Sequence, residues 1–461
     1  MVGIFSGLLL SCAFEPLGLW FLAPIAFLTF FIGLKKSKHP VVDSFLFGLV
    51  SNLVALHWSG KYVGITPWII LSILQALFYI PVGLVFKRYR SIALLIPVIL
   101  ALEELRARFP FGGFAWTRIG FSQVDAPYIN VVSIGGALSA SALVLLLAAI
   151  LSSPHRRNLL LAILILVAPL FLTHANAVTQ SLNVIGIQGN TPSVGLGFNE
   201  RAKAVFDLHV LETKRMVKEK YDLIVWPENA VDLDPISNAF VGREIADLAV
   251  ALDTPLIVGA VLNSRGSIEN ASMMYTKSGE ISSIYVKRHL TPFGEYMPLR
   301  KIAEVISPYA QQVNDFTAAQ DRVTHRVNGY SLGPIICYEL IDDGLVRDMA
   351  IHSNALIVQT NSATFAGTAE GAQQLAITRI RAIEHNRDVL SVSTVGISAL
   401  LDNNGNVIEQ SQENVAAAIA GKLPMRTGLT ISDRLGGVAP LVVLFLSLML
   451  GFRARKNEYL R

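Results

Sequence analysis

The sequence predicts a polytopic helical membrane domain of about eight transmembrane helices, joined to an α/β domain that lies outside the membrane. Hydrophobic residues make up 52% and charged residues 16% of the 461 residues, which is too apolar for an ordinary soluble protein. Long apolar segments fill the first 176 residues and recur once near the C-terminus. The region between them alternates short β-branched runs with amphipathic stretches, which is typical of an α/β fold.

Eight apolar segments are the predicted membrane spans, and most approach the roughly 20 residues that cross a hydrocarbon core. Seven of them form the membrane domain, residues 1–176, and the eighth lies at 436–452. The segments are residues 1–14, 17–34, 40–58, 63–86, 91–105, 131–152, 158–173 and 436–452. The start, "MVGIFSGLLLSC", resembles a signal with a lipid-attachment cysteine, but it has no basic residue and continues into another apolar segment. We therefore expect a first helix, with Cys12 as a packing residue.

Basic residues cluster after spans two, four, six and eight, and by the positive-inside rule each cluster is cytoplasmic. The clusters are Lys35, Lys36 and Lys38; Lys87, Arg88 and Arg90; Arg156 and Arg157; and Arg453, Arg455 and Lys456. We therefore expect a multi-pass protein of the cell membrane, with residues 180–425 outside the cytoplasm and a cytoplasmic tail, residues 453–461. The net charge of +4 is small, and this distribution does not predict nucleic-acid binding.

Residues 180–425 predict alternating strands and helices. The expected strands are "LNVIGIQGN", "LIVWPEN", "PLIVGAVLNS", "GPIICYEL", "ALIVQTNSA" and "DVLSVSTVG". Helices are expected at 199–219, at 239–252, from Gly344 and near 368–386, and hairpins are expected to turn at Lys277 to Gly279 and at "NNGN".

No motif for a cofactor or a metal stands out. Phosphate-binding glycine loops, the dinucleotide fingerprint and a serine nucleophile elbow are absent, and the nine histidines show no metal-ligand spacing. Charged residues inside spans would favour transport, but Glu103, Glu104 and Arg106 lie near the end of span five, where we expect them to face the interface or the site.

A carboxylate, an amine and a thiol each follow a predicted strand: Glu228, Lys287 and Cys337. Strand ends at one sheet edge can bring such side chains together. A thiol is mostly protonated at neutral pH, so Glu228 could accept its proton and the Lys287 ammonium could stabilise the thiolate and an oxyanion. Two alternatives stay open: Cys337 is a core thiol, or it pairs with His352 or His385 in a Cys-His dyad.

The ordered motifs "WPEN", "KRHLTPFGEYMP" and "CYE" resemble the nitrilase superfamily. With seven spans before this region and one after it, and with "QGNTP" at 188–192 and "PFGGFAW" at 110–116, the chain resembles the apolipoprotein N-acyltransferases. The resemblance implies a nitrilase-like α-β-β-α sandwich with Glu228 as general base, Lys287 as oxyanion stabiliser and Cys337 as nucleophile. Glu295 and Glu339 match supporting acids, and Tyr338 follows the nucleophile. One departure is "NSATFAG" at 361–367, which lacks a tryptophan found in the family.

The expected function is acyl transfer from a phospholipid, through a thioester on the cysteine, to the N-terminal amine of diacylglyceryl-cysteine lipoproteins in a bacterial membrane. The chain is expected to be a monomer, without cofactor, metal or nucleic-acid partner. Phe198, Phe293, Phe316 and Phe365 either meet acyl chains or pack within loops. The nearest alternative is a membrane-anchored carbon-nitrogen hydrolase that uses the same three residues, and a transporter or scaffold with an inactive outer domain is more distant.

Overall fold

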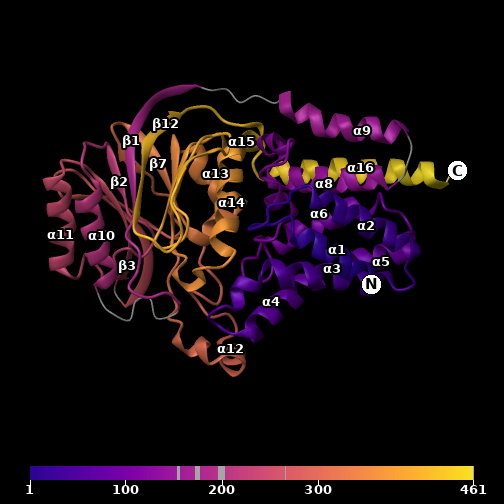
Figure 1. Cartoon of the computed structure of the whole chain (residues 1–461), viewed down its shortest axis with the longest axis horizontal. Coiled ribbons are helices and arrows are strands. Elements are labelled where there is room, and N and C mark those ends of the chain that lie inside the picture. Colours follow the sequence, from indigo (N-terminus) through magenta and orange to yellow (C-terminus); the bar gives the residue numbers. More distant parts are fainter. Residues whose placement is uncertain (153–155, 172–176, 196–202, 265, 460–461) are drawn as a thin grey trace. The chain divides into compact units, whose positions relative to one another are not determined.

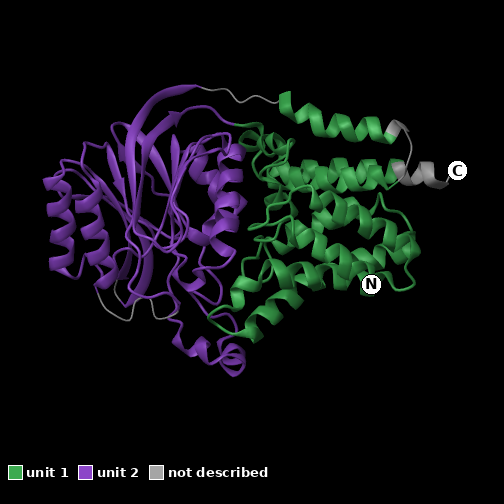
Figure 2. Cartoon of the chain, in the orientation of Figure 1, with its two compact units in different colours: residues 1–174, 430–461 green, residues 175–429 purple. Residues whose placement is uncertain are grey.

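The chain forms two compact units in the computed structural model (Figure 2). Unit 1 comprises Met1–His174 and Thr430–Arg461, and unit 2 comprises Ala175–Leu429. The structure describes residues 1–152, 156–171, 177–195, 203–264 and 266–459.

Unit 1 is helical, and each of the eight predicted apolar segments contains a helix (Figure 1). Its α-helices are α1 (Val2–Ser11), α2 (Leu22–Lys36), α3 (Pro40–Ala55), α4 (Ile65–Leu77), α5 (Ile80–Tyr89), α6 (Leu95–Arg106), α7 (Val132–Gly135), α8 (Ala137–Leu151), α9 (Arg156–Val167), α15 (Ile431–Leu435) and α16 (Val438–Tyr459). By length and composition, Ile65–Tyr89 is the one helical stretch among the described residues that could cross a membrane. The count of eight spans therefore stays a prediction.

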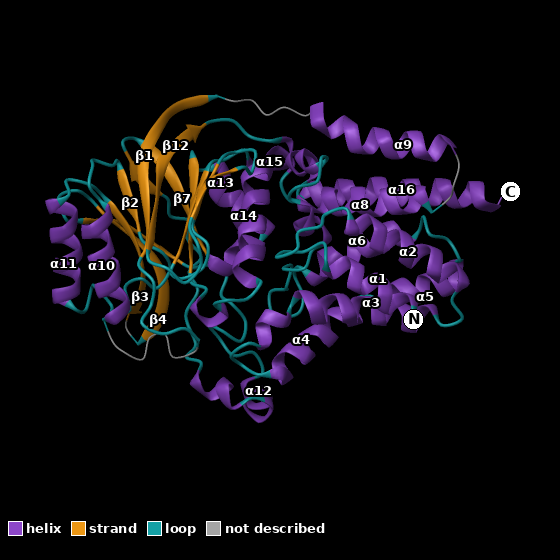
Figure 3. Ribbon diagram, viewed as in Figure 1, coloured by secondary structure: helices purple, strands orange, loops and turns teal. Residues whose placement is uncertain are grey.

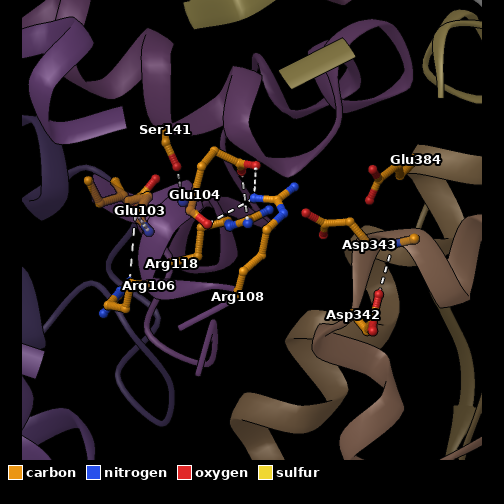
Figure 4. Close-up of polar contacts among 12 residues, drawn as sticks. Glu103, Glu104, Arg106, Arg108, Arg118, Ser141, Asp342, Asp343 and Glu384 are labelled. Atoms are coloured by element: carbon orange, nitrogen blue, oxygen red, sulfur yellow. Dashed lines mark hydrogen bonds and ion pairs between the residues drawn. The ribbon is translucent and has the colours of Figure 1, made fainter. Parts of the chain in front are cut away.

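Charged side chains at the end of α6 form a buried network inside unit 1 (Figure 4). Glu104 pairs with Arg118 at 3.1 Å and with Arg108 at 2.5 Å. Glu103 accepts a hydrogen bond from the backbone N–H of Ile119 at 2.7 Å, and Arg106 donates to the Thr117 hydroxyl at 2.7 Å. The sequence predicts that Glu103, Glu104 and Arg106 face the membrane interface or the site. The three side chains are buried, so the prediction that they face the membrane interface is wrong. They join α6 to residues 117–119.

Unit 2 contains two six-stranded sheets with the same pattern of pairing. The first has the order β12-β1-β2-β3-β4-β5 and the second β11-β10-β9-β8-β7-β6. In each, three neighbouring strands run parallel, β1-β2-β3 and β7-β8-β9, and antiparallel strands complete both sides. The strands are β1 (Val178–Gln188), β2 (Leu223–Val225), β3 (Leu256–Ser264), β4 (Ser267–Tyr275), β5 (Ile281–Val286), β6 (His325–Val327), β7 (Tyr330–Ile336), β8 (Ala355–Thr360), β9 (Val389–Ser393), β10 (Ala399–Leu401), β11 (Val407–Gln410) and β12 (Ala417–Arg426).

The two sheets pack face to face because alternate residues of their strands are apolar on both faces. On β2, Leu223 and Val225 belong to the core between the sheets, together with Ile357 and Leu390 of the second sheet. Ile224, between them in the sequence, points to the opposite core beneath the helices. Period-two alternation with both sets apolar is what a sheet covered on both sides requires.

Helices cover the outer faces, which gives the α-β-β-α sandwich that the resemblance implied (Figure 3). Helices α10 (Ala204–Met216) and α11 (Ala239–Ala251) lie on the first sheet, and α13 (Asp343–Ile351) and α14 (Glu370–His385) lie on the second. A short helix, α12 (Arg300–Ile306), follows β5. The predicted helices at 239–252, from Gly344 and near 368–386 are confirmed within two residues, as are both predicted hairpins, β4-β5 and β10-β11.

Gly259 of β3 lets the chain after β2 pass directly over the strand. A Cβ atom at this position would lie 2.2 Å from the carbonyl oxygen of Pro227 and 2.7 Å from Cα of Glu228. Both are backbone atoms, so a larger residue forces the segment at Glu228 to move.

We expect Gly259→Ala to lower the free energy of unfolding by about 1–3 kcal/mol, the usual cost of overpacking a close-packed site. The matched control is Gly344→Ala, because the nearest atom to its added Cβ is Asp342 Oδ1 at 3.4 Å, an ordinary contact. Thermal unfolding of the full chain in detergent measures both. Equal midpoints for the two variants would contradict the close approach at Gly259.

Candidate active site

The structure places two of the three predicted residues directly after strand ends and the third, Glu228, shortly beyond one. Glu228 is three residues beyond the end of β2, while Lys287 follows β5 and Cys337 follows β7 immediately. Glu228 and Lys287 come from the first sheet and Cys337 from the second. The backbone at Glu228 is also held from the second sheet, because the Thr394 hydroxyl donates to the Glu228 carbonyl at 2.9 Å. The site therefore depends on the packing of the two sheets.

The Lys287 ammonium lies between two carboxylates. Its Nζ is 3.3 Å from Oε1 of Glu228 and 2.8 Å from Oε2 of Glu295. The Lys287 side chain is 1% exposed, so the amine is buried with its partners. Burial alone would lower the Lys287 pKa, but the charges of Glu295 and Glu228 outweigh it and raise the pKa above its ordinary value. Lys287 is thus a fixed cation at neutral pH.

Asn270 joins the same two carboxylates and was not singled out as a site residue by sequence reasoning. Its side-chain amide nitrogen donates to Oε1 of Glu228 and to Oε1 of Glu295, both at 2.7 Å. Asn270 lies on β4 beside Lys287, whose backbone N–H donates to the Asn270 carbonyl at 2.8 Å. The predicted hairpin, with its turn at Lys277 to Gly279, brings residue 270 opposite residue 286, and the register shift between Met274 and Tyr275 moves the pairing by one residue, to Lys287.

The Glu295 side chain is held in the loop after β5 by the backbone of that loop. Its Oε2 accepts from the backbone N–H of Thr291 at 2.7 Å. Burial raises the pKa of Glu295, but the Lys287 ammonium and this hydrogen bond lower the pKa by more than burial raises it, so the net shift is downward. Glu295 is therefore the permanent counter-charge of Lys287.

The net shift of the Glu228 pKa is upward, opposite to that of Glu295. Burial raises its pKa, the Lys287 charge lowers it, and the nearby Glu295 carboxylate raises it again, which leaves the pKa above that of an ordinary glutamate. A carboxylate whose proton affinity is raised is better suited to accept a proton than an ordinary glutamate.

Cys337 occupies a turn in the left-handed region, with φ of 49°. For a residue with a Cβ this conformation costs about 1–2 kcal/mol, and it is found where the surrounding structure imposes it. Here the turn leads from β7 into the short 3₁₀ helix η6 (Cys337–Ile341). The Cys337 sulfur lies 3.6 Å from the side-chain nitrogen of Gln374 on α14. Gln374 is a second residue that the sequence did not single out.

Burial raises the pKa of the Cys337 thiol well above its ordinary value, and the Glu228 charge raises it further, while Lys287 lowers it. The Lys287 ammonium therefore favours the thiolate, as the sequence indicated, but burial outweighs this effect. The resting group is a thiol and needs a base. The charges of Glu228 and Lys287 thus both act on the Cys337 thiol.

Glu339 fixes the turn at Cys337 and is fully buried. Its Oε2 accepts from the backbone N–H of Ile336 at 2.8 Å, and its Oε1 accepts from the Arg288 N–H at 2.7 Å and the Tyr285 hydroxyl at 2.8 Å. One carboxylate therefore connects the residue before Cys337 to the residue after Lys287. Burial raises the pKa of Glu339, although these donors oppose the shift.

The predicted aromatic residues differ in their surroundings. Tyr338 is buried, with its ring 5.4 Å from that of His289. Phe293 is exposed in the loop between Lys287 and Glu295, and Phe316 and Phe365 are half-buried. Phe198 lies outside the described residues. A role for these phenylalanines in binding acyl chains stays a prediction.

The alternative Cys-His dyad finds no geometric support. His385 lies on α14 eleven residues beyond Gln374, the residue that reaches the thiol, which is about 16 Å along the helix axis. His352 is 42% exposed, and its ring nitrogen bonds to the carbonyl of Asp348 at 2.8 Å. Among the described residues, no group of three or more His, Cys, Asp or Glu side chains is placed to hold a metal ion.

We expect Asn270→Ala to lower the free energy of unfolding by about 2–3 kcal/mol, because two buried carboxylates each lose a donor. The pKa of Glu228 should rise further, since the lost hydrogen bond favours its ionised form. Denaturant unfolding of the full chain measures the effect. Asn263→Ala, at an exposed position of the neighbouring strand, is the control, and equal losses in both variants would contradict the bridging role.

Two family models match the chain. Residues 6–150 match the apolipoprotein N-acyltransferase N-terminal domain, and residues 183–426 match the carbon-nitrogen hydrolase family. The second match covers most of unit 2.

Curated relatives match over most of the chain. The apolipoprotein N-acyltransferase of Mycolicibacterium smegmatis is 30% identical over 95% of this chain and 82% of its own length. The enzymes of the same name from Pseudomonas paraeruginosa and Shewanella oneidensis are 30% and 26% identical, over 78% and 97% of this chain and 73% and 94% of their own. Among solved structures, a carbon-nitrogen hydrolase superfamily protein from Xanthomonas campestris aligns with 57% of this chain and 97% of its own, at 17% identity and a TM-score of 0.41. From the family models and the curated relatives, we conclude that the chain belongs to the apolipoprotein N-acyltransferase family and carries its nitrilase-like carbon-nitrogen hydrolase domain in residues 183–426.

Proposed function

We propose that this acyltransferase moves a fatty acyl chain from a membrane phospholipid, through a thioester on Cys337, to the N-terminal amine of a diacylglyceryl-cysteine lipoprotein. The observation that carries the proposal is the charge cluster of Glu228, Lys287 and the loop residue Glu295, whose charges act on the Cys337 thiol. A base, a fixed cation and a nucleophile are what acyl transfer through a covalent intermediate requires.

In the first half-reaction, Glu228 takes the proton of the Cys337 thiol as the sulfur attacks the ester carbonyl of the phospholipid. The resulting tetrahedral oxyanion is stabilised by the Lys287 ammonium. The carbon-oxygen bond to the glycerol then breaks, and the proton returns from Glu228 to the departing oxygen. The products of this step are a lysophospholipid and a thioester on Cys337.

In the second half-reaction, the neutral amine of the lipoprotein attacks the thioester carbonyl. Glu228 takes a proton from the attacking nitrogen, the carbon-sulfur bond breaks, and the proton returns to the sulfur. An amide forms and the thiol is restored, which completes a ping-pong cycle. Glu295 supports Lys287, and Glu339 and Tyr338 hold the turn that carries the thiol.

We also propose the membrane arrangement that the sequence predicts. Residues 1–176 would supply seven spans and 436–452 the eighth, with 180–425 outside the cytoplasm and 453–461 inside. A monomer with this arrangement meets both lipid substrates at the bilayer surface, where Phe198, Phe293 and Phe365 are candidates to contact acyl chains. Excluding water there protects the thioester from hydrolysis.

The first test is the acyl-enzyme itself. Purified full chain is mixed with phospholipid that carries a tagged acyl chain, and we expect a hydroxylamine-labile label at Cys337. Cys337→Ala should abolish the label, whereas Cys12→Ala, which removes the other cysteine, should keep it.

A chase then separates acyl transfer from hydrolysis. A diacylglyceryl-cysteine lipopeptide with a free amine should discharge the label, and the same lipopeptide with an acetylated amine should not. Label that persists in Cys337→Ala would remove the thiol from the mechanism. Discharge by water as fast as by the free amine would favour the carbon-nitrogen hydrolase.

A second prediction concerns the base. Glu228→Gln should slow formation of the acyl-enzyme about 10²- to 10⁴-fold, because an amide cannot accept the thiol proton. The control is Glu409→Gln, which removes an exposed carboxylate of the same unit. The rate of labelling at saturating phospholipid is the measurement, and a rate within threefold of the unmodified chain would exclude Glu228 as the base.

A further inference from the structure

Glu370 is a buried carboxyl group near the proposed site that the proposed mechanism does not use. It is the first residue of α14 and is 2% exposed. Gln374, one turn further along the helix, contacts the Cys337 sulfur at 3.6 Å. Residues four apart lie on the same helix face, so Glu370 and Gln374 both point toward the side of α14 that faces the thiol.

The surroundings of Glu370 are acidic. Its Oε2 is buried without a hydrogen-bond partner, and none of the ion pairs between described residues includes Glu370. Two carboxylates act on it: Glu228, and Glu413 in the loop between β11 and β12. A Cβ added at Gly371 would lie 2.6 Å from Oε1 of Glu413, which places that carboxylate against the start of α14. A buried acid with acidic neighbours and no cation beside it is held in its neutral form.

The pKa of Glu370 reflects this environment. Burial raises it, Glu413 and Glu228 raise it further, and the hydroxyl of Ser362 opposes them, which brings it to about 8. The influence is mutual, since an ionised Glu370 also raises the pKa of the Cys337 thiol. The titratable groups that face this acid are therefore Glu228, Glu413 and Cys337.

We propose that Glu370 is a positioning residue of the acylation step that must carry its own proton for Cys337 to become a thiolate. This inference rests on the proposed function. Neutral Glu370 leaves the thiol facing one Lys287 cation, the Glu295 counter-charge and the Glu228 base. The proton then moves from sulfur to Glu228, and Glu370 keeps its own proton throughout. Once Glu370 ionises, an additional negative charge opposes the developing thiolate, and acylation slows.

The test is the pH dependence of acyl-enzyme formation by the full chain, measured with tagged phospholipid in vesicles of phosphatidylethanolamine and phosphatidylglycerol. For the unmodified chain we expect the rate to fall above pH 8, because Glu370, with a pKa of about 8, loses its proton there. The rate at pH 9 should be about one tenth of the rate at pH 7, in proportion to the protonated fraction of Glu370. Glu370→Gln stays neutral at every pH and should raise this ratio about tenfold.

A second variant leaves Glu370 in place. Glu413→Gln removes a neighbouring negative charge, so the pKa of Glu370 should decrease and the alkaline fall should move to lower pH. Glu409→Gln, on the strand β11 that precedes the loop of Glu413, is the matched control and should leave the profile unchanged.

Three results would overturn the inference: no alkaline fall in the unmodified chain, the same fall in Glu370→Gln, or an unshifted fall in Glu413→Gln. If Glu370→Gln does not fold, the shift of the alkaline fall in Glu413→Gln tests the inference on its own. The absence of label at any pH in the unmodified chain would instead overturn the proposed function, and this inference with it.

Discussion

The site depends on one buried ammonium group held between two carboxylates. Lys287 contacts Glu228 and Glu295, and Asn270 bridges the same two acids from the neighbouring strand. Removing any one partner would leave a buried charge uncompensated, which is costly in a low-dielectric interior. The Lys287 ammonium favours the ionised form of both acids, while the Glu295 carboxylate opposes ionisation of Glu228. The pKa of Glu295 is therefore lowered, which makes Glu295 a counter-charge, and the pKa of Glu228 is raised, which suits Glu228 to take a proton.

This charge cluster is also where the two sheets meet. Glu228, Lys287 and Asn270 belong to the first sheet and Cys337 to the second, and Glu339 connects the turn at Cys337 to the backbone after Lys287. The Thr394 hydroxyl holds the backbone at Glu228 by a hydrogen bond, and the absence of a side chain at Gly259 leaves room for that backbone. The geometry of the candidate site therefore depends on how the two sheets pack against each other.

Local sequence pattern was enough to predict most of the strands and the positions of Glu228, Lys287 and Cys337 beyond strand ends, but it missed β6 and β12. The rule that reactive side chains gather at strand ends singled out these three residues as candidates. Gln374 and Glu370 were missed because they lie near Cys337 only through the face of α14 that packs toward the thiol. A helical sequence pattern predicts the helix but not the element against which each of its faces packs. The net shift of the Cys337 pKa could not be predicted for a related reason: burial outweighs the adjacent amine, and burial is a property of the whole fold. Apolar composition located the helices of unit 1 but not their ends: α3 and α6 have 16 and 12 residues, fewer than the roughly 20 that cross a hydrocarbon core.

The left-handed backbone at Cys337 has a consequence for how this nucleophile can change. With φ of 49°, the position admits residues with one substituent on Cβ far more readily than β-branched ones. Cysteine can therefore be exchanged for serine without disturbing the turn, whereas threonine would strain it. The main-chain geometry thus limits which side chains position 337 can carry, independently of their reactivity.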